Sequence, residues 1–142
     1  MAAMAGELVR MHHRQDPGRF MQPPDVEAGY RWWFGKELGR PEAVLLVAVS
    51  DGELVGYAYG TREERDWNAL LDVHGALHDI FVAAAHRRSG VGARLLDAIV
   101  AALEAKGAPR IVLSTMVSNE AAQSLFRAHG FRPTMVEMTH GG

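Results

Sequence analysis

The chain has 142 residues, a length that fits one folded domain. Its composition, 48% hydrophobic and 23% charged, excludes a disordered or collagen-like protein. It contains no cysteine, which excludes disulfides, thiolate metal sites and a cysteine nucleophile. The formal net charge is -2, the basic residues are scattered, and no apolar run approaches the ~20 residues that span a bilayer, so we expect a cytoplasmic protein without a nucleic-acid or membrane partner.

Two helices are expected first. Residues 3–14 have apolar positions at helical spacing, and the Asp16-Pro17-Gly18 sequence ends that element. Two prolines then precede Asp25, which we expect to cap a second helix, and the Gly39-Arg40-Pro41 sequence ends it.

Three strands are expected next. Every residue from Ala43 to Val49 is apolar, which is typical of a buried central strand. The Asp51-Gly52 pair predicts a hairpin turn that returns the chain as a second strand over Glu53 to Thr61. A polar loop over 62–72 leads to a third strand from Val73 to Val82.

The C-terminal half begins with the clearest helix, from Gly90 to Lys106, whose apolar residues share one face. A strand from Ile111 to Val117, a helix capped by Asn119 and a short final strand over 133–138 are expected to follow. This order predicts an α+β fold, with a mixed sheet flanked by about four helices.

The segment between the third strand and the long helix has the features of an anion site. A helix start presents unpaired N–H groups and a partial positive charge. The glycines of Arg87-Arg88-Ser89-Gly90-Val91-Gly92 allow close approach to the backbone, and the two arginines add charge. The sequence therefore predicts a phosphate or pyrophosphate site, although its spacing matches neither a Walker loop nor a dinucleotide-binding fingerprint.

Two motifs in order resemble those of the GNAT superfamily of N-acetyltransferases. The first is Arg87-x-x-Gly90-x-Gly92 after a strand, and the second is Asn119-x-x-Ala122-x-x-Leu125-Phe126-x-x-x-Gly130-Phe131. The resemblance covers about residues 43–138. It implies one acetyltransferase-like domain over 1–142, with a helical acceptor-side region over 1–41 and an acetyl-CoA-binding core over 42–142. It also implies a mostly antiparallel sheet, which here lacks the family's usual first strand.

The resemblance implies that acetyl-CoA is the cosubstrate and that its acetyl group moves to a primary amine by direct attack in a ternary complex. The pantetheine arm would lie where the strand ending at Val82 splays from the next strand. The residues that the resemblance assigns to cofactor binding are Ile80, Phe81, Val82, Arg87, Arg88, Ser89, Gly90, Val91, Gly92, Ala93, Asn119, Ala122 and Phe126.

Candidate catalytic residues are less well defined by the sequence. Asp79 and His78 precede the loop, and alternation along a strand would turn one of them toward the cleft, where either could be a general base. The alternative is that one is buried and hydrogen-bonded and the other is a solvated polar residue. Phe126 stands where the family usually has a tyrosine that protonates the departing thiolate. Ser118, Ser124 or a water could replace it, and we expect that water does. No metal site is expected.

The acceptor is expected to be a small-molecule or peptide amine, and the acidic loop near Trp67 could attract a cation. Trp32-Trp33 could wall its pocket. A homodimer through the final strand is possible. The absence of a tyrosine at Phe126 and of an obvious base leaves open a second function, a non-catalytic acyl-CoA-binding or regulatory module.

Overall fold

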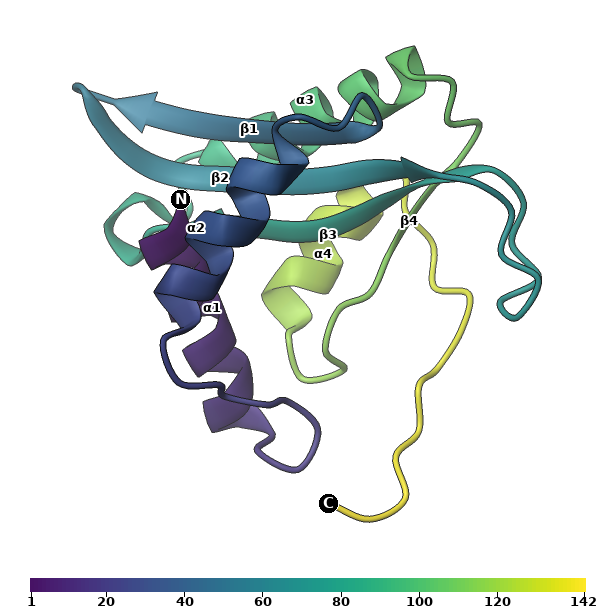
Figure 1. The fold of residues 1–142 in the computed structure, drawn as a ribbon, viewed down its shortest axis with the longest axis horizontal. Helices are drawn as coiled ribbons and strands as arrows, with labels where there is room; N and C mark the ends of the chain where they lie inside the picture. The colour runs from purple at the N-terminus through teal and green to yellow at the C-terminus, as the bar shows by residue number, and fades with distance from the viewer.

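The computed structural model describes all of residues 1–142 (Figure 1). Its helices and strands are α1 (Ala2–Gln15), α2 (Val26–Glu37), β1 (Ala43–Ser50), β2 (Glu53–Glu63), β3 (His74–Val82), a 3-10 turn (Ala84–His86), α3 (Val91–Ala105), β4 (Ile111–Leu113) and α4 (Glu120–Ala128). The sheet has the order β1-β2-β3-β4, in which β1, β2 and β3 are antiparallel and β3 and β4 are parallel. This mixed, mostly antiparallel sheet with four α-helices matches the predicted fold class.

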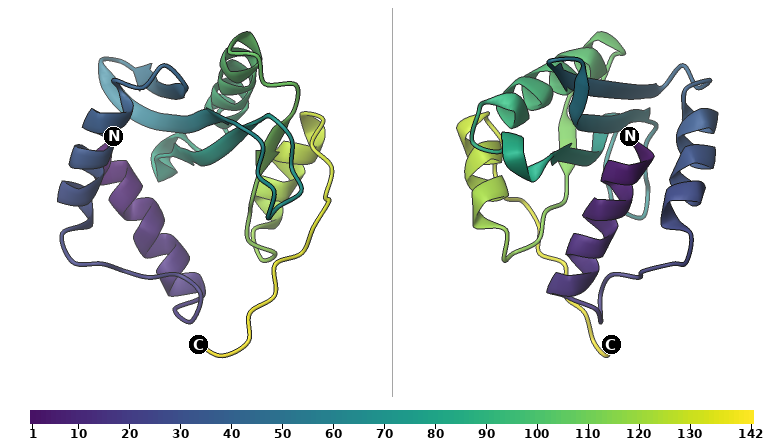
Figure 2. Two further views of the ribbon diagram at one scale, coloured as in Figure 1. Left: turned by 45° about the vertical axis from the view of Figure 1, so that its right-hand side comes forward. Right: turned by 90° about the vertical axis from the view of Figure 1, so that its left-hand side faces the viewer.

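Helices cover both faces of the sheet (Figure 2). On one face, α3 buries its apolar stripe, which includes Leu96, Ile99 and Leu103, against Ala58 and Leu77 of the central strands. On the opposite face, α1 and α2 pack on an aromatic cluster of buried residues: Ala5, Leu8, Phe34, Tyr57, Tyr59 and Phe81. The sheet therefore separates two cores, because alternate residues of each strand point to opposite faces.

The predicted turn at Asp51-Gly52, the cap at Asn119 and the helix end at Gly130 are confirmed, whereas the predicted cap at Asp25 is wrong. Asp51 and Gly52 have φ values of 50° and 78°, the left-handed values that a tight hairpin requires. The side chain of Asn119 accepts a hydrogen bond from the Ala122 amide at 3.1 Å, so it caps α4. Gly130 has a φ of 89° and ends that helix, and Phe131 folds back with its amide on the Phe126 carbonyl at 3.0 Å.

The prediction of a buried central strand over Ala43 to Val49 was wrong about its place in the sheet. This strand, β1, is an edge strand that pairs only with β2. Its side chains toward α3 are covered, whereas Val47 and Val49 on the other face are 45% and 59% exposed. The apolar run therefore reflects one covered face and one partly open face.

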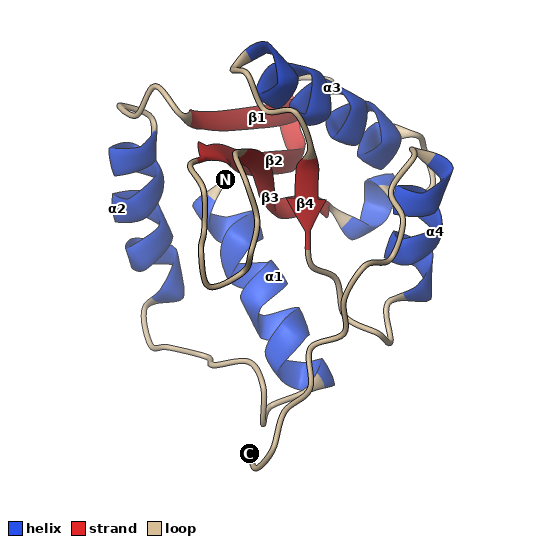
Figure 3. Ribbon diagram, turned by 90° about the vertical axis from the view of Figure 1, so that its right-hand side faces the viewer, coloured by secondary structure: helices blue, strands red, loops and turns tan.

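The C-terminal strands also differ from the prediction. Strand β4 ends at Leu113 instead of Val117, and the final strand over 133–138 does not form. Residues beyond Phe131 run away from the sheet without ladder pairing, as Figure 3 shows. An ion pair from Arg19 to Glu137 holds this segment against the loop between α1 and α2 instead.

Two further observations complete the fold. Asp25 does not cap α2 with its side chain, since its own backbone is left-handed with a φ of 52°. None of the helices combines the length and the apolar character needed to cross a lipid bilayer.

Candidate functional site

The separation of β3 from β4 is the first feature of the site. The two strands pair only from Gly75 to Leu77, opposite Ile111 to Leu113. Beyond this point β3 continues to Val82, paired on its β2 side alone. The Ala83 amide bonds the Val55 carbonyl of β2, and backbone groups alternate between the two edges of a strand, so Ile80 and Val82 face the parted strands without a ladder partner there, as expected for the splayed pair (Figure 3).

The start of α3 lies at the end of this splayed region. The first intrahelical hydrogen bond runs from the Arg94 amide to the Gly90 carbonyl at 3.1 Å, so the amides before Arg94 precede the helix ladder. Gly90 has a φ of 87° and Arg88 one of 63°, and this sharp turn directs the chain into the helix. The amide groups and the helix dipole form a suitable cradle for a diphosphate.

The side chains of this loop are mostly exposed. Arg87 donates from Nε to the Val82 carbonyl at 2.9 Å, with its guanidinium 5.5 Å from the centroid of the Phe81 ring. Ser89 donates to the His86 carbonyl. A Cβ added at Gly92 would lie 3.6 Å from Leu125 and 3.7 Å from Val82, so this helix start is close to both α4 and β3. The remaining loop residues expected to hold the cofactor are Val91 and Ala93, both half-buried.

The three residues in and before α4 that were expected to bind the cofactor, Asn119, Ala122 and Phe126, make contacts within the protein itself. Asn119 uses its side-chain oxygen for the helix cap. Phe126 is only 7% exposed and packs its ring edge-on to Phe131 at 5.9 Å, within the core under α3, and Ala122 packs against the same core. The low exposure of Phe126 is explained by core packing alone.

A β-bulge determines where the two candidate bases point. Tyr59 pairs with Asp79 and Gly60 pairs with Leu77, so His78 is an extra residue in β3. The bulge turns His78 and Asp79 to the same face, the one covered by α1 and α2. The expectation from strict alternation, that only one of them would face the acceptor side, was therefore wrong.

Asp79 is half-buried on this face and has a phenol as its partner. The Tyr57 hydroxyl donates to the carboxylate at 3.1 Å. Burial raises the pKa of Asp79, although the hydrogen bond from Tyr57 and the nearby imidazoles of His78 and His12 oppose that shift. Asp79 is therefore a stronger base than an ordinary aspartate.

His78 is exposed, and its ring stacks on Tyr59 with centroids 5.0 Å apart. The hydroxyl of Thr61 donates to Glu63 at 2.6 Å, so its oxygen accepts from His78 Nε2 at 2.8 Å. This arrangement places the proton of the neutral ring on Nε2 and leaves the lone pair on Nδ1. Desolvation of the ring lowers the pKa of His78, which favours that neutral form.

A buried carboxylate supports the same face from α2. Glu37 is 1% exposed, and it accepts from the Tyr59 hydroxyl at 2.7 Å and from Arg40 at 3.0 and 3.1 Å. Burial raises the pKa of Glu37, but these hydrogen bonds outweigh it and the pKa is lowered overall. The carboxylate therefore stays charged and ties α2 to the Tyr59 ring that packs on His78.

Sequence reasoning missed Tyr57, Thr61 and Glu37. The period-two alternation of Tyr57, Tyr59 and Thr61 along one strand would have placed their side chains on one face. Nothing local to α2 indicated that Glu37 would be buried, since its partner Tyr59 is 22 residues away.

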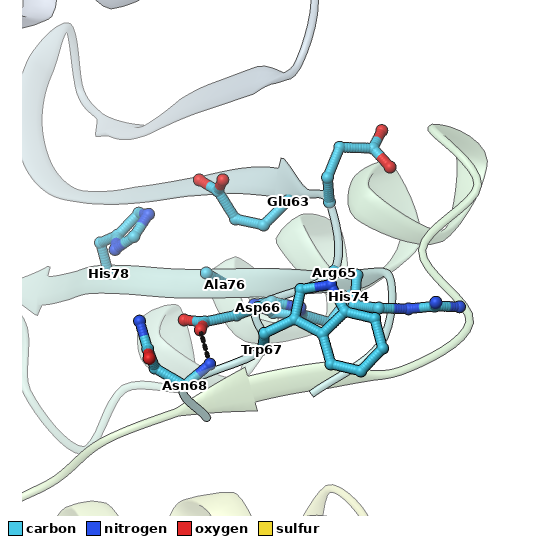
Figure 4. A pocket seen from close by; sticks show the side chains of 9 residues that line it. Glu63, Arg65, Asp66, Trp67, Asn68, His74, Ala76 and His78 are labelled. Atoms are coloured by element: carbon cyan, nitrogen blue, oxygen red, sulfur yellow. Dashed lines mark hydrogen bonds between the residues drawn. The ribbon is translucent and has the colours of Figure 1, made fainter. Parts of the chain in front are cut away.

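A polar pocket of about 640 Å³ lies beside His78 (Figure 4). Its lining residues come from β2, β3 and the acidic loop, and they are Glu63, Glu64, Arg65, Asp66, Trp67, Asn68, His74, Ala76 and His78. Several of its charged groups pair within the protein, since Glu63 bonds Thr61 and Arg65 bonds Asp72. The third catalytic candidate, Ser118, lies exposed in the turn before α4.

The splayed mixed sheet with an amide-lined helix start at the splay is the arrangement that the resemblance to acetyltransferases led us to expect. The acetyltransferase (GNAT) family matches residues 6–131 of the chain. The chain therefore belongs to the GNAT acetyltransferase family, as the two sequence motifs predicted.

Similar proteins include enzymes with different acceptors. The chain is 32% identical to an N-alpha-acetyltransferase of Sulfurisphaera tokodaii, over 74% of this chain and 66% of that protein. It is 30% identical to an L-methionine sulfoximine/L-methionine sulfone acetyltransferase of Pseudomonas paraeruginosa, over 77% of this chain and 61% of that protein. The alignments thus span slightly less than two thirds of these relatives.

Among solved structures, the fold is similar to that of the aminoglycoside acetyltransferase AAC(6')-Iy in complex with a bisubstrate analog of coenzyme A. The TM-score is 0.71 at 22% identity, over 94% of this chain and 87% of that one. This likeness shows that the fold is shared.

Proposed function

We propose that the protein is an N-acetyltransferase that moves an acetyl group from acetyl-CoA to a primary amine by direct attack in a ternary complex. Two observations carry the proposal. The pairing of β3 with β4 ends at Leu77, and the start of α3, which lies at the end of the splayed region, has unpaired amides. Membership of the GNAT family supports the same reaction class. The N-acetyltransferase activities of the relatives and the coenzyme A analog of AAC(6')-Iy agree with it.

The cosubstrate fits the chain's own groups. The amides from Arg88 to Ala93, with Arg87 and Arg88 beside them, provide donors and positive charge for a diphosphate. On the β4 side, the backbone of Ile80 and the amide of Val82 have no strand partner and provide donors and an acceptor for the amide groups of a pantetheine arm, whereas the Val82 carbonyl already accepts from Arg87. An N–H of this segment can also stabilise the oxyanion that develops on the acyl carbonyl.

The reacting amine must first lose a proton. At neutral pH this costs about 4–5 kcal/mol for an alkyl amine of pKa ~10.4. Asp79 is the group we assign to accept the proton, because it is half-buried, its pKa is raised, and Tyr57 orients its carboxylate. His78 Nδ1 is the second candidate, since Thr61 occupies the other ring nitrogen.

The transfer then forms the N–C bond and breaks the C–S bond. A thiol of pKa ~8.5 leaves as a thiolate that water can protonate. We assign no acid to the protein at this step, because Phe126 carries no proton and is packed in the core. Ser118 remains an alternative donor that mutation to alanine would test.

The test is incubation with acetyl-CoA and a panel of primary amines, with free thiol as the readout. Thiol release above the hydrolysis background is expected for at least one amine. Asp79→Asn should lower kcat/KM by about 10²–10⁴-fold, and His78→Gln should lower it less. A larger loss from His78→Gln would reverse the assignment of the base.

The pH profile provides a second readout. Asp79 acts in its charged form, so kcat/KM rises as the pH increases through its raised pKa, and this limb should disappear in Asp79→Asn.

A non-catalytic acyl-CoA-binding module is the second candidate function, favoured by the absence of a phenol at Phe126. This function predicts coenzyme A binding by calorimetry without thiol release from any amine. Thiol release that depends on Asp79 would exclude it.

A further inference from the structure

A second pocket lies on the acceptor side and is lined by residues of α1, α2 and the loop that joins them. Its volume is about 790 Å³, within the range of small-molecule sites. Its lining is largely apolar and comprises Val9, His12, Arg19, Phe20, Met21, Pro23, Pro24, Asp25, Val26, Gly29, Tyr30 and Trp33. We call it the α1–α2 pocket.

Aromatic contacts connect this pocket to the proposed base. The Tyr30 ring packs against Phe34 with centroids 5.2 Å apart, and Phe34 meets Tyr57 edge-on at 5.8 Å. The Tyr57 hydroxyl bonds Asp79. Burial lowers the pKa of His12 and raises the pKa of Tyr30, and the nearby Asp79 charge opposes the first shift and adds to the second, so both of these lining residues lie within range of that charge. An ammonium group attracted to Asp79 would therefore carry its substituent toward this pocket.

The chemistry of the two acceptor-side pockets differs. The pocket beside His78 is lined mainly by charged and polar side chains, and two of them are already paired with groups outside the lining, Glu63 with Thr61 and Arg65 with Asp72. The α1–α2 pocket also includes three polar side chains, Arg19, His12 and Asp25, but most of its exposed lining consists of aromatic rings, proline rings and aliphatic groups. Such a lining gains from covering the apolar surface of a substituent.

We propose that the α1–α2 pocket binds the substituent of the acceptor, so that the enzyme selects a primary amine carrying an aromatic or branched aliphatic group over a polycationic amine. This inference rests on the proposed acetyltransferase function. A free arylalkylamine and a peptide with an apolar N-terminal residue both combine a primary amine with such a group.

Gly29 provides a sharp test. It lies on α2 and lines the pocket, and a Cβ added there would meet no atom within 4 Å. A leucine side chain at this position therefore has room at the wall of the pocket without a clash at its Cβ. Gly35 is a matched control, because it lies on the same helix, is exposed, has equally open surroundings and does not line the pocket.

The substrates compared are 2-phenylethylamine, ethylamine, spermidine and a short peptide with N-terminal phenylalanine. We expect kcat/KM for 2-phenylethylamine or the peptide to exceed that for ethylamine and spermidine by at least about tenfold. The better of the two apolar substrates identifies the free amine or the peptide terminus as the source.

The variants separate pocket binding from a general defect. Gly29→Leu should raise KM for the preferred apolar amine at least about tenfold more than KM for ethylamine, whereas Gly35→Leu should match the wild type. Calorimetric titration of 2-phenylethylamine into the coenzyme A-saturated protein should show the same loss in Gly29→Leu.

The experiments distinguish failure of the pocket assignment from failure of the proposed acetyltransferase function. Absence of thiol release from every amine would overturn the proposed function. Acetylation of spermidine at least as efficiently as 2-phenylethylamine and the peptide, or equal KM values in Gly29→Leu and Gly35→Leu, would overturn the pocket assignment and leave the acetyltransferase proposal standing.

Discussion

Removal of one hydroxyl from Tyr59 tests whether the buried Glu37 network stabilises the acceptor side of the fold. In Tyr59→Phe the aromatic ring remains in its cluster, but the Glu37 carboxylate loses its 2.7 Å hydrogen bond and retains only Arg40. A hydrogen bond to a charged group contributes about 1.5–3 kcal/mol to stability. The free-energy cost of leaving a buried acceptor without one of its donors is of similar size. We expect the free energy of unfolding at pH 7 to fall by that amount.

The measurement is urea denaturation followed by tryptophan fluorescence, with the free energy compared at an unchanged m-value. Tyr30→Phe is the matched control, because it deletes the same group on the same side of the molecule, and no hydrogen bond affects the pKa of that phenol. Its change should stay within about 0.5 kcal/mol.

The pH dependence follows from the lowered pKa of Glu37. A carboxylate whose folded pKa is depressed contributes stability that is present above its usual value of 4.5 and is lost as the pH falls through the folded value. The difference between wild type and Tyr59→Phe should therefore be full at pH 7 and shrink below pH 4.5. If Tyr59→Phe were as stable as wild type at pH 7, or no more affected than Tyr30→Phe, the network would have no stabilising role.

Three further substitutions have defined outcomes. Gly56→Ala should destabilise the fold by about 1–3 kcal/mol in urea denaturation, because its Cβ would lie 2.7 Å from the Phe81 carbonyl oxygen, and an unchanged midpoint would contradict this. Gly92→Ala meets only ordinary contacts within the protein, so thermal unfolding should be unchanged, whereas KM for acetyl-CoA should rise several-fold if the backbone here approaches the diphosphate. Phe126→Tyr should not raise kcat, because the ring lies in the core, and a tenfold gain would show that a phenol there can serve as the acid.

Local chemistry in the sequence determined the hairpin and the cap of α4. Asp51-Gly52 adopted left-handed values because that turn type requires them, and Asn119 capped α4 through a contact three residues away. The apolar spacing after Gly90 likewise determined α3. Each of these features depends on residues close together in the chain, so a single sequence is sufficient to predict it.

The tertiary structure decided the features that depend on distant partners. Whether the apolar run of β1 lies at the centre or the edge depends on which strands pair beside it, and the run itself is compatible with both. The bulge at His78 arises from register with β2, and it alone turns both His78 and Asp79 to the acceptor side. The burial of Glu37 likewise depends on Tyr59, because strand register and helix docking are set by long-range packing that local propensity does not encode.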